Sequence, residues 1–168
     1  MVIRKNLSTR FALISVFDKI DLKILCISLK KYNYKLISTG STCKKIKSLG
    51  FDCIEISKIT KFKEILEGRV KTLNPKIFGS ILYKRDDKEH IKEFEGLKVP
   101  SISLVIVNLY PFKKFSKYKN VDKIIEMIDI GGPSLIRAAA KNFKYVTTIC
   151  NKKYYPKLID NLNKNNGD

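Results

Sequence analysis

The residues of this chain best suited to chemistry lie in three short segments. Residues 68–75 (GRVKTLNP) place Arg69, Lys71 and Thr72 within four positions, and an Asn-Pro pair typical of turns closes the segment. Two cations and a hydroxyl this close together are suited to an anionic, oxygen-rich ligand. Residues 107–112 (VNLYPF) and 128–133 (IDIGGP) add the phenol of Tyr110 and the carboxylate of Asp129 where apolar runs break. Together these groups predict an acid/base site.

A fourth segment is suited to phosphate. Residues 38–42 (STGST) stand between a predicted strand and the start of a predicted helix. Hydroxyls and backbone N–H groups at the positive end of a helix can hold a phosphate group. The alternative is a helix cap, in which Ser41 or Thr42 satisfies free N–H groups with no ligand present.

The elements that must position these groups alternate between strand and helix. Strands are predicted at residues 11–16, 35–38, 52–56, 103–107 and 145–150. Helices are predicted at residues 22–31, 42–49, 133–142 and 154–162, and residues 76–82 fit either a helix or an extended segment. The order predicts an α/β fold of three layers, a mostly parallel sheet with helices on both faces. The run at 103–107 is apolar throughout, as expected of a strand buried on both faces.

Ligands of open parallel sheets bind beyond the carboxyl ends of the strands, so groups that follow different strands should meet there. Lys141 is a special case, because it lies late in a predicted helix. It shares a helix face with Ser134 and Arg137, opposite Leu135, and this face is predicted to point back towards the site. The alternative is a solvated face.

Composition favours one globular domain, since the chain has 168 residues of which 44% are hydrophobic. No apolar run approaches the roughly 20 residues that cross a bilayer, and residues 1–5 lack a secretory signal. We therefore expect a soluble, cytoplasmic protein with no membrane partner. The formal net charge is +18, but the lysines are spread along the whole chain, so nucleic acid is not the expected partner.

The cysteines and the single histidine are not predicted to do chemistry. Cys26, Cys43, Cys53 and Cys150 show no metal-ligand spacing and are interpreted as buried free thiols. His90 lies in the charged stretch 84–95 and is interpreted as a solvated helix residue, so no metal site is predicted. The polar tail at 163–168 is predicted to be frayed.

Five segments, taken in order, resemble the inosine monophosphate cyclohydrolase domain of the bifunctional purine-biosynthesis enzymes that also carry 5-aminoimidazole-4-carboxamide ribonucleotide formyltransferase activity. They are residues 13–19 (LISVFDK), 38–42 (STGST), 68–75 (GRVKTLNP), 108–112 (NLYPF) and 129–142 (DIGGPSLIRAAAKN). The resemblance implies a methylglyoxal-synthase-like fold and a homodimer. The chain is expected to be one cyclohydrolase domain over residues 1–168 without the formyltransferase domain, and a separate formyltransferase is a candidate partner.

The implied reaction closes the second purine ring. The carboxamide nitrogen of the formamido ribonucleotide attacks the formyl carbon and water leaves, with no metal or redox cofactor. By resemblance, Asp129 and Lys141 form the proton-transfer pair, while Lys71 and Tyr110 stabilise charge on the formyl oxygen. The substrate-binding residues implied by the same match are Ser15, Lys19, Thr39, Gly40, Ser41, Thr42, Arg69, Thr72, Asn108, Ile130 and Gly131.

Four positions depart from the family pattern. Phe17 stands where the family often has a small hydroxyl residue, and Ser41 replaces the second glycine of a Gly-Gly-Thr run. Asn74 and Phe143 replace customary histidines. These departures affect substrate affinity more than the chemistry.

Two other proteins of the same fold are the alternatives. One is a non-catalytic, nucleotide-binding regulatory domain like that of carbamoyl phosphate synthetase, which has no need of Lys71, Tyr110, Asp129 and Lys141 together. The other is methylglyoxal synthase, whose His-containing loop has no counterpart in this chain.

Overall fold

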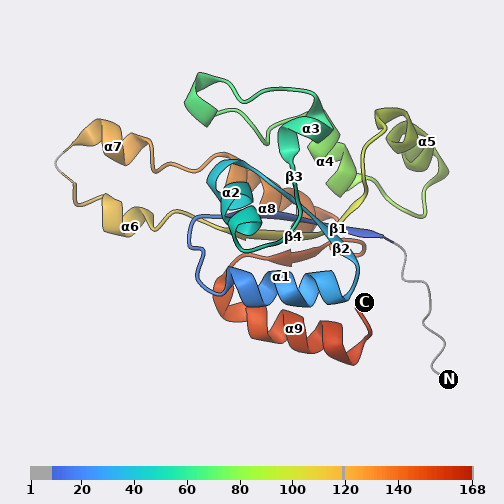
Figure 1. The fold of residues 1–168 in the computed structure, drawn as a ribbon. Helices are drawn as coiled ribbons and strands as arrows, with labels where there is room; N and C mark the ends of the chain where they lie inside the picture. Colours follow the sequence, from blue (N-terminus) through green and yellow to red (C-terminus); the bar gives the residue numbers. More distant parts are fainter. Residues whose placement is uncertain (1–8, 119, 168) are drawn as a thin grey trace.

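The sheet has five parallel strands in the order β3-β2-β1-β4-β5. The computed structural model describes residues 9–118 and 120–167. The strands are β1 (Arg10–Val16), β2 (Tyr34–Ser38), β3 (Cys53–Glu55), β4 (Ile102–Asn108) and β5 (Thr147–Ile149). Helices cover both faces, so the predicted three-layer α/β architecture is confirmed (Figure 1).

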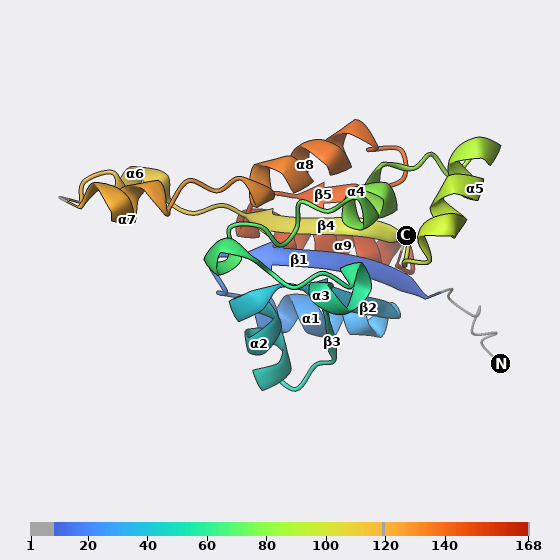
Figure 2. The same cartoon turned by 90° about the horizontal axis from the view of Figure 1, so that it is seen from above.

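Most helices lie in two layers on the faces of the sheet, and two short helices extend from one end of the domain. They are α1 (Leu22–Lys31), α2 (Gly40–Ser48), α3 (Ile56–Thr60), α4 (Pro75–Leu82), α5 (Lys88–Leu97), α6 (Phe112–Phe115), α7 (Val121–Ile125), α8 (Gly131–Lys141) and α9 (Tyr155–Lys164), with 3-10 turns η1 (Leu66–Gly68) and η2 (Lys152–Tyr154). Figures 1 and 2 show α1 and α9 on one side of the sheet and α4 and α8 on the other. Both views also show α6 and α7 projecting from one end of the domain; we call residues 109–118 and 120–130 the arm.

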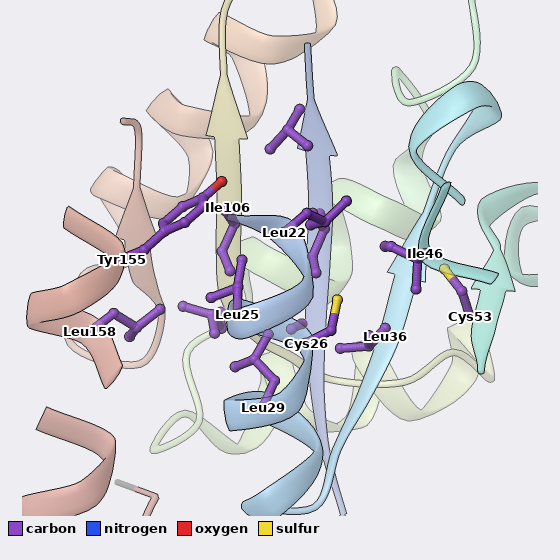
Figure 3. Close-up of a cluster of buried hydrophobic side chains, with 14 of the residues drawn as sticks. Leu22, Leu25, Cys26, Leu29, Leu36, Ile46, Cys53, Ile106, Tyr155 and Leu158 are labelled. Atoms are coloured by element: carbon purple, nitrogen blue, oxygen red, sulfur yellow. The ribbon is translucent and has the colours of Figure 1, made fainter. Parts of the chain in front are cut away.

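The face that packs on α1 and α9 has the larger cluster of buried side chains. Leu22, Leu25 and Leu29 form a stripe on α1 that is at most 1% exposed. Figure 3 shows this stripe against the sheet, with Tyr155 and Leu158 of α9 beside it. Burying one such side chain contributes about 1.5–3 kcal/mol, so the stripe holds α1 in place. The predicted burial of the thiols is confirmed for Cys26, Cys43 and Cys53, whereas Cys150 is exposed.

The other face packs on α4 and α8. Val105 of β4 and Leu13 of β1 contact this layer, which contributes Ile81 from α4 and Leu135 from α8. Because neighbouring residues of β4 face opposite layers, Ile106 joins the cluster on the α1 side. The prediction that β4 is buried on both faces is confirmed.

Several boundaries differ from the predictions for local reasons. The predicted third strand ends earlier, because Ile56 begins α3. Residues 75–82 are helical: Pro75 occupies the first turn and the side chain of Asn74 accepts a hydrogen bond from the Lys76 N–H at 3.0 Å. Both α2 and α8 begin two residues before their predicted starts, at Gly40 and Gly131.

The predicted frayed tail is wrong over residues 163–167. The Asn163 side chain accepts hydrogen bonds from Lys31 and from the Tyr32 hydroxyl at 3.0 and 2.7 Å, which ties α9 to α1. Residue 168 lies outside the described residues, as do residues 1–5. Among the residues that the structure describes, no helix has the length and apolar character needed to span a membrane.

Asn142 joins the ends of two helices and provides a test of this packing. It is 7% exposed, and its side-chain amide donates to the carbonyls of Ile81 and Tyr83 at 2.7 and 3.0 Å. We expect Asn142→Ala to lower the free energy of unfolding by about 1–3 kcal/mol, because both carbonyls lose their donor. Urea unfolding followed by circular dichroism measures this, with Arg137→Ala, an exposed position of the same helix, as the matched control. Equal stability of the two variants would contradict the role of Asn142.

Candidate active site

The carboxyl ends of the central strands open into a pocket of about 550 Å³. Its walls come from the loops after β1 and β4, the start of α2, residues 67–72, and the arm where it meets α8. Every site residue predicted from the sequence lines this pocket except Lys141. Those it brings together are Ser15, Lys19, Thr39, Gly40, Ser41, Thr42, Arg69, Lys71, Thr72, Asn108, Tyr110, Asp129, Ile130 and Gly131.

Asn108 holds the loop that follows β1 against the end of β4. Its side-chain oxygen accepts from the Asp18 N–H and its amide nitrogen donates to the Asp18 carbonyl, both at 2.9 Å. Lys152 forms a 2.7 Å ion pair with the Asp18 carboxylate, and this hydrogen bond lowers the pKa of Asp18 below its ordinary value. Asn108 therefore shapes the pocket by fixing this loop, in addition to lining it.

The Thr39–Thr42 segment opens α2, as the phosphate hypothesis requires. The Thr42 hydroxyl is occupied, since it donates to the Val16 carbonyl at 2.9 Å. The predicted cap alternative is not how this helix begins, because its N-cap is Thr39, which makes no side-chain capping bond. The Gly40 N–H donates to the Glu55 carboxylate at 3.1 Å. An anion would therefore meet the other N–H groups of the first turn and the exposed Ser41.

Thr72 and Gly131 meet in a seam that joins residues 68–75 to the start of α8. Thr72 is only 5% exposed, and its hydroxyl oxygen lies 2.5 Å from the position that a Cβ on Gly131 would occupy. A Cβ on the next residue, Gly132, would meet the Asp129 carboxylate. The two glycines therefore permit a close approach of backbone and side chains that no larger residue allows.

Asp129 is held in place by the helix that it precedes. Its Oδ1 accepts a hydrogen bond from the Gly132 N–H at 2.8 Å. Asp129 therefore has a structural role, because it satisfies an N–H of the first turn of α8. A carboxylate has a second oxygen, so this bond orients the group and leaves Oδ2 able to accept a proton.

Tyr110 and Lys71 provide a phenol and an ammonium on the same pocket. Tyr110 is half-buried, and its burial, together with the nearby Asp129 charge, raises the pKa of the phenol above its ordinary value. The phenol therefore stays protonated at neutral pH and can donate a hydrogen bond. The Lys71 Nζ lies 3.3 Å from the place where Gly68 would carry a Cβ, in a stretch where Gly68 has φ +88°.

Lys141 is the exception, and the expectation that it points back to the site is wrong within one chain. α8 begins at the pocket with Gly131 and ends with Lys141. Ten residues along a helix cover about 15 Å, so the helix carries Lys141 to the far end. There the side chain is exposed, as the solvated alternative predicts.

Two carboxylates of the pocket were missed by sequence reasoning. Glu67 and Glu126 line it, and Glu126 forms an ion pair with Arg69, a predicted substrate contact. The pair links η1 to the end of α7. The composition of the chain could have pointed to them. Because the sequence has 16 acidic residues and 34 lysines and arginines, each carboxylate is a strong candidate to pair with a cation of the site.

The comparisons with known proteins agree with this geometry. The profile of the family described as "MGS-like domain" matches residues 22–134. The chain is 46% identical over 92% of its length to "Bifunctional purine biosynthesis protein PurH" of Caldicellulosiruptor bescii, and 49% identical over 90% to the protein of the same name from Clostridioides difficile. It spans 30% of the length of each of these relatives. Among solved structures, "Crystal structure of ForH" superposes with a TM-score of 0.80 at 27% identity, over 95% of this chain and 81% of that one.

The seam at Gly131 generates a prediction. Gly131→Ala should cost about 1–3 kcal/mol of stability, because the new methyl group overlaps the Thr72 hydroxyl and the tightly packed seam must shift. Thermal unfolding followed by circular dichroism measures this loss of stability. Gly96→Ala is the matched control, since a Cβ there meets nothing within 4 Å and lies within α5. The seam would have no role in stability if the two variants unfolded at the same temperature.

Proposed function

Since this chain belongs to the MGS-like domain family, we propose that it is an inosine monophosphate cyclohydrolase of purine biosynthesis. It closes the ring of 5-formamidoimidazole-4-carboxamide ribonucleotide with loss of water, as a cytoplasmic homodimer. The observation that carries the proposal is the meeting of Lys71, Tyr110 and Asp129 on one pocket beside the start of α2. The purine-biosynthesis relatives support it.

Asp129 is the proton acceptor in this proposal. An amide nitrogen is a poor nucleophile until it loses proton density, and the carboxylate is oriented by its bond to the Gly132 N–H. The carboxamide nitrogen bonds to the formyl carbon and gives up one proton. The formamide nitrogen gives up a second, and the formyl oxygen leaves with both as water.

Lys71 and Tyr110 stabilise the charge that develops on the formyl oxygen. The raised pKa of Tyr110 keeps its phenol a donor, and an ammonium offers a charge that needs no rearrangement during the reaction. The start of α8 lies on the same wall, where Ile130 and Gly131 line the pocket. The N–H groups of a first helical turn add positive potential there.

The ribonucleotide phosphate lies at the start of α2. Gly40 and Ser41 of its first turn line the pocket, as does Lys19 on the loop after β1. The Lys19 Nζ donates to the Phe17 carbonyl at 3.2 Å. Ser15, Arg69 and Thr72 also line the pocket; in this proposal Ser15 serves the phosphate, and Arg69 and Thr72 contact the base and ribose.

Lys141 can serve the reaction only from a second copy of the chain. Its own pocket lies at the opposite end of α8, about 15 Å away. An exposed ammonium at a helix end is available to another molecule, and Phe143, two residues on, is 82% exposed. In a two-fold symmetric dimer each copy would supply Lys141 to the other copy's pocket.

The chemical roles predict specific losses of rate. Asp129→Asn, which keeps an oxygen for the Gly132 N–H, and Lys71→Met should each lower kcat by about 10²–10⁴-fold. The ultraviolet absorbance of inosine monophosphate measures this, with Asp86→Asn as the control, since that exposed carboxylate pairs with Lys144 outside the pocket. Wild-type protein that binds the nucleotide without turnover would instead support the regulatory-domain alternative.

The exchange of Lys141 between copies predicts complementation. Asp129→Asn and Lys141→Ala should each be inactive alone, yet an equal mixture that has exchanged subunits should recover about a quarter of wild-type activity, because half of the dimers carry one intact site. Each variant mixed with itself is the control. A mixture as inactive as its components would rule out delivery of Lys141 from a partner.

A further inference from the structure

Phe17 lines the pocket without a role in the reaction. It directly follows β1 and is 40% exposed, although a large aromatic side chain gains most from burial. Its position is well defined, because the Phe17 N–H donates to the Asn108 carbonyl at 3.4 Å and the next residue is held by the Asn108 amide. Phe17 is thus fixed to Asn108 at the end of β4, and Asn108 stands two positions before Tyr110 in the sequence.

The Phe17 ring contacts two rings of the arm. Its centroid lies 5.0 Å from that of Tyr110 at an interplanar angle of 63°, and 6.2 Å from that of Phe115 at 89°. Both are edge-to-face contacts, the geometry that aromatic pairs favour. Phe115 in turn meets Tyr118 at 5.2 Å. A chain of rings therefore runs from the loop after β1 into the arm.

The Tyr110 ring needs such support because its backbone is leaving the sheet. β4 ends at Asn108, Pro111 follows Tyr110, and the arm projects beyond the domain (Figure 2). Asp129, at the other end of the arm, is held by α8. The distance between phenol and carboxylate thus depends on how residues 109–111, the first segment of the arm, are anchored.

We propose that Phe17 is a positioning residue, whose ring holds the Tyr110 phenol over the pocket and anchors the arm to the domain. This positioning role deepens the proposed function, and the expected effect on kcat rests on that function. A small hydroxyl residue at this position would add a phosphate contact but lose both ring contacts. Phe17 therefore acts on the reacting end of the substrate rather than on its phosphate.

A kinetic test distinguishes an effect of Phe17 on the reacting end of the substrate from an effect on its phosphate. Phe17→Ser should lower kcat roughly tenfold, because the phenol is misplaced, and leave KM unchanged or lower. Phe17→Tyr, which keeps the ring, should recover most of the lost rate. In the Tyr110→Phe background, Phe17→Ser should have no further effect on kcat, because the group it positions is already gone. A full tenfold loss in that background overturns the proposal.

A second readout does not depend on turnover. With 3-fluorotyrosine at the tyrosine positions, the ¹⁹F resonance that disappears in Tyr110→Phe belongs to Tyr110. It should shift in Phe17→Ser, return in Phe17→Tyr and stay in place in Phe62→Ser, a control that removes an exposed ring outside the pocket. If the wild type has no activity and the resonance still shifts, the proposed function fails and the positioning stands. An unmoved resonance in Phe17→Ser overturns the positioning whatever the activity.

Discussion

The parallel pairing of β1 with β4 is the constraint on which the site depends. Its register sets Val16 opposite Asn108 at the carboxyl ends of the two strands. The loops that follow must therefore leave the sheet side by side, and the Asn108 amide locks them together through Asp18. Residues some 90 positions apart in the sequence become neighbours by this pairing, so the pocket exists only when the sheet is complete.

Several groups at the pocket serve the fold and the site at once. Asp129 caps the start of α8, Asn108 fixes the loop after β1, and the Thr42 hydroxyl bonds to Val16 of β1. Each bond stabilises a helix end or loop and also fixes the direction in which a pocket group points. This shared use explains why a structural role and a role in the site do not exclude one another at these residues.

The large positive charge is interrupted at the pocket by carboxylates. Glu67, Glu126 and Asp129 line it, and Glu55 occupies the first N–H of α2 just outside. The whole chain has a net charge of +18. At the pocket, these carboxylates offset part of the positive charge of the lysines and the arginine that would bind an anionic nucleotide. The Arg69 guanidinium is paired with Glu126, and this pairing weakens its non-specific attraction for anions. The charge of the whole chain is therefore a poor guide to the charge that a ligand meets.

The sequence by itself determined the alternation of strands and helices and the two-sided burial of β4, and 14 of the 15 site residues named from it line the pocket. The elements follow from local periodicity, whereas the site residues follow from short segments, such as residues 68–75, that resemble the family. Only the tertiary structure decided that Lys141 lies a helix length away from Asp129, that Arg69 faces Glu126, and that the Phe17 ring meets Tyr110. Helical periodicity reports the face on which a residue lies but not the direction in which the helix axis runs. Contacts between distant segments depend on how the layers pack, and no local pattern contains that information.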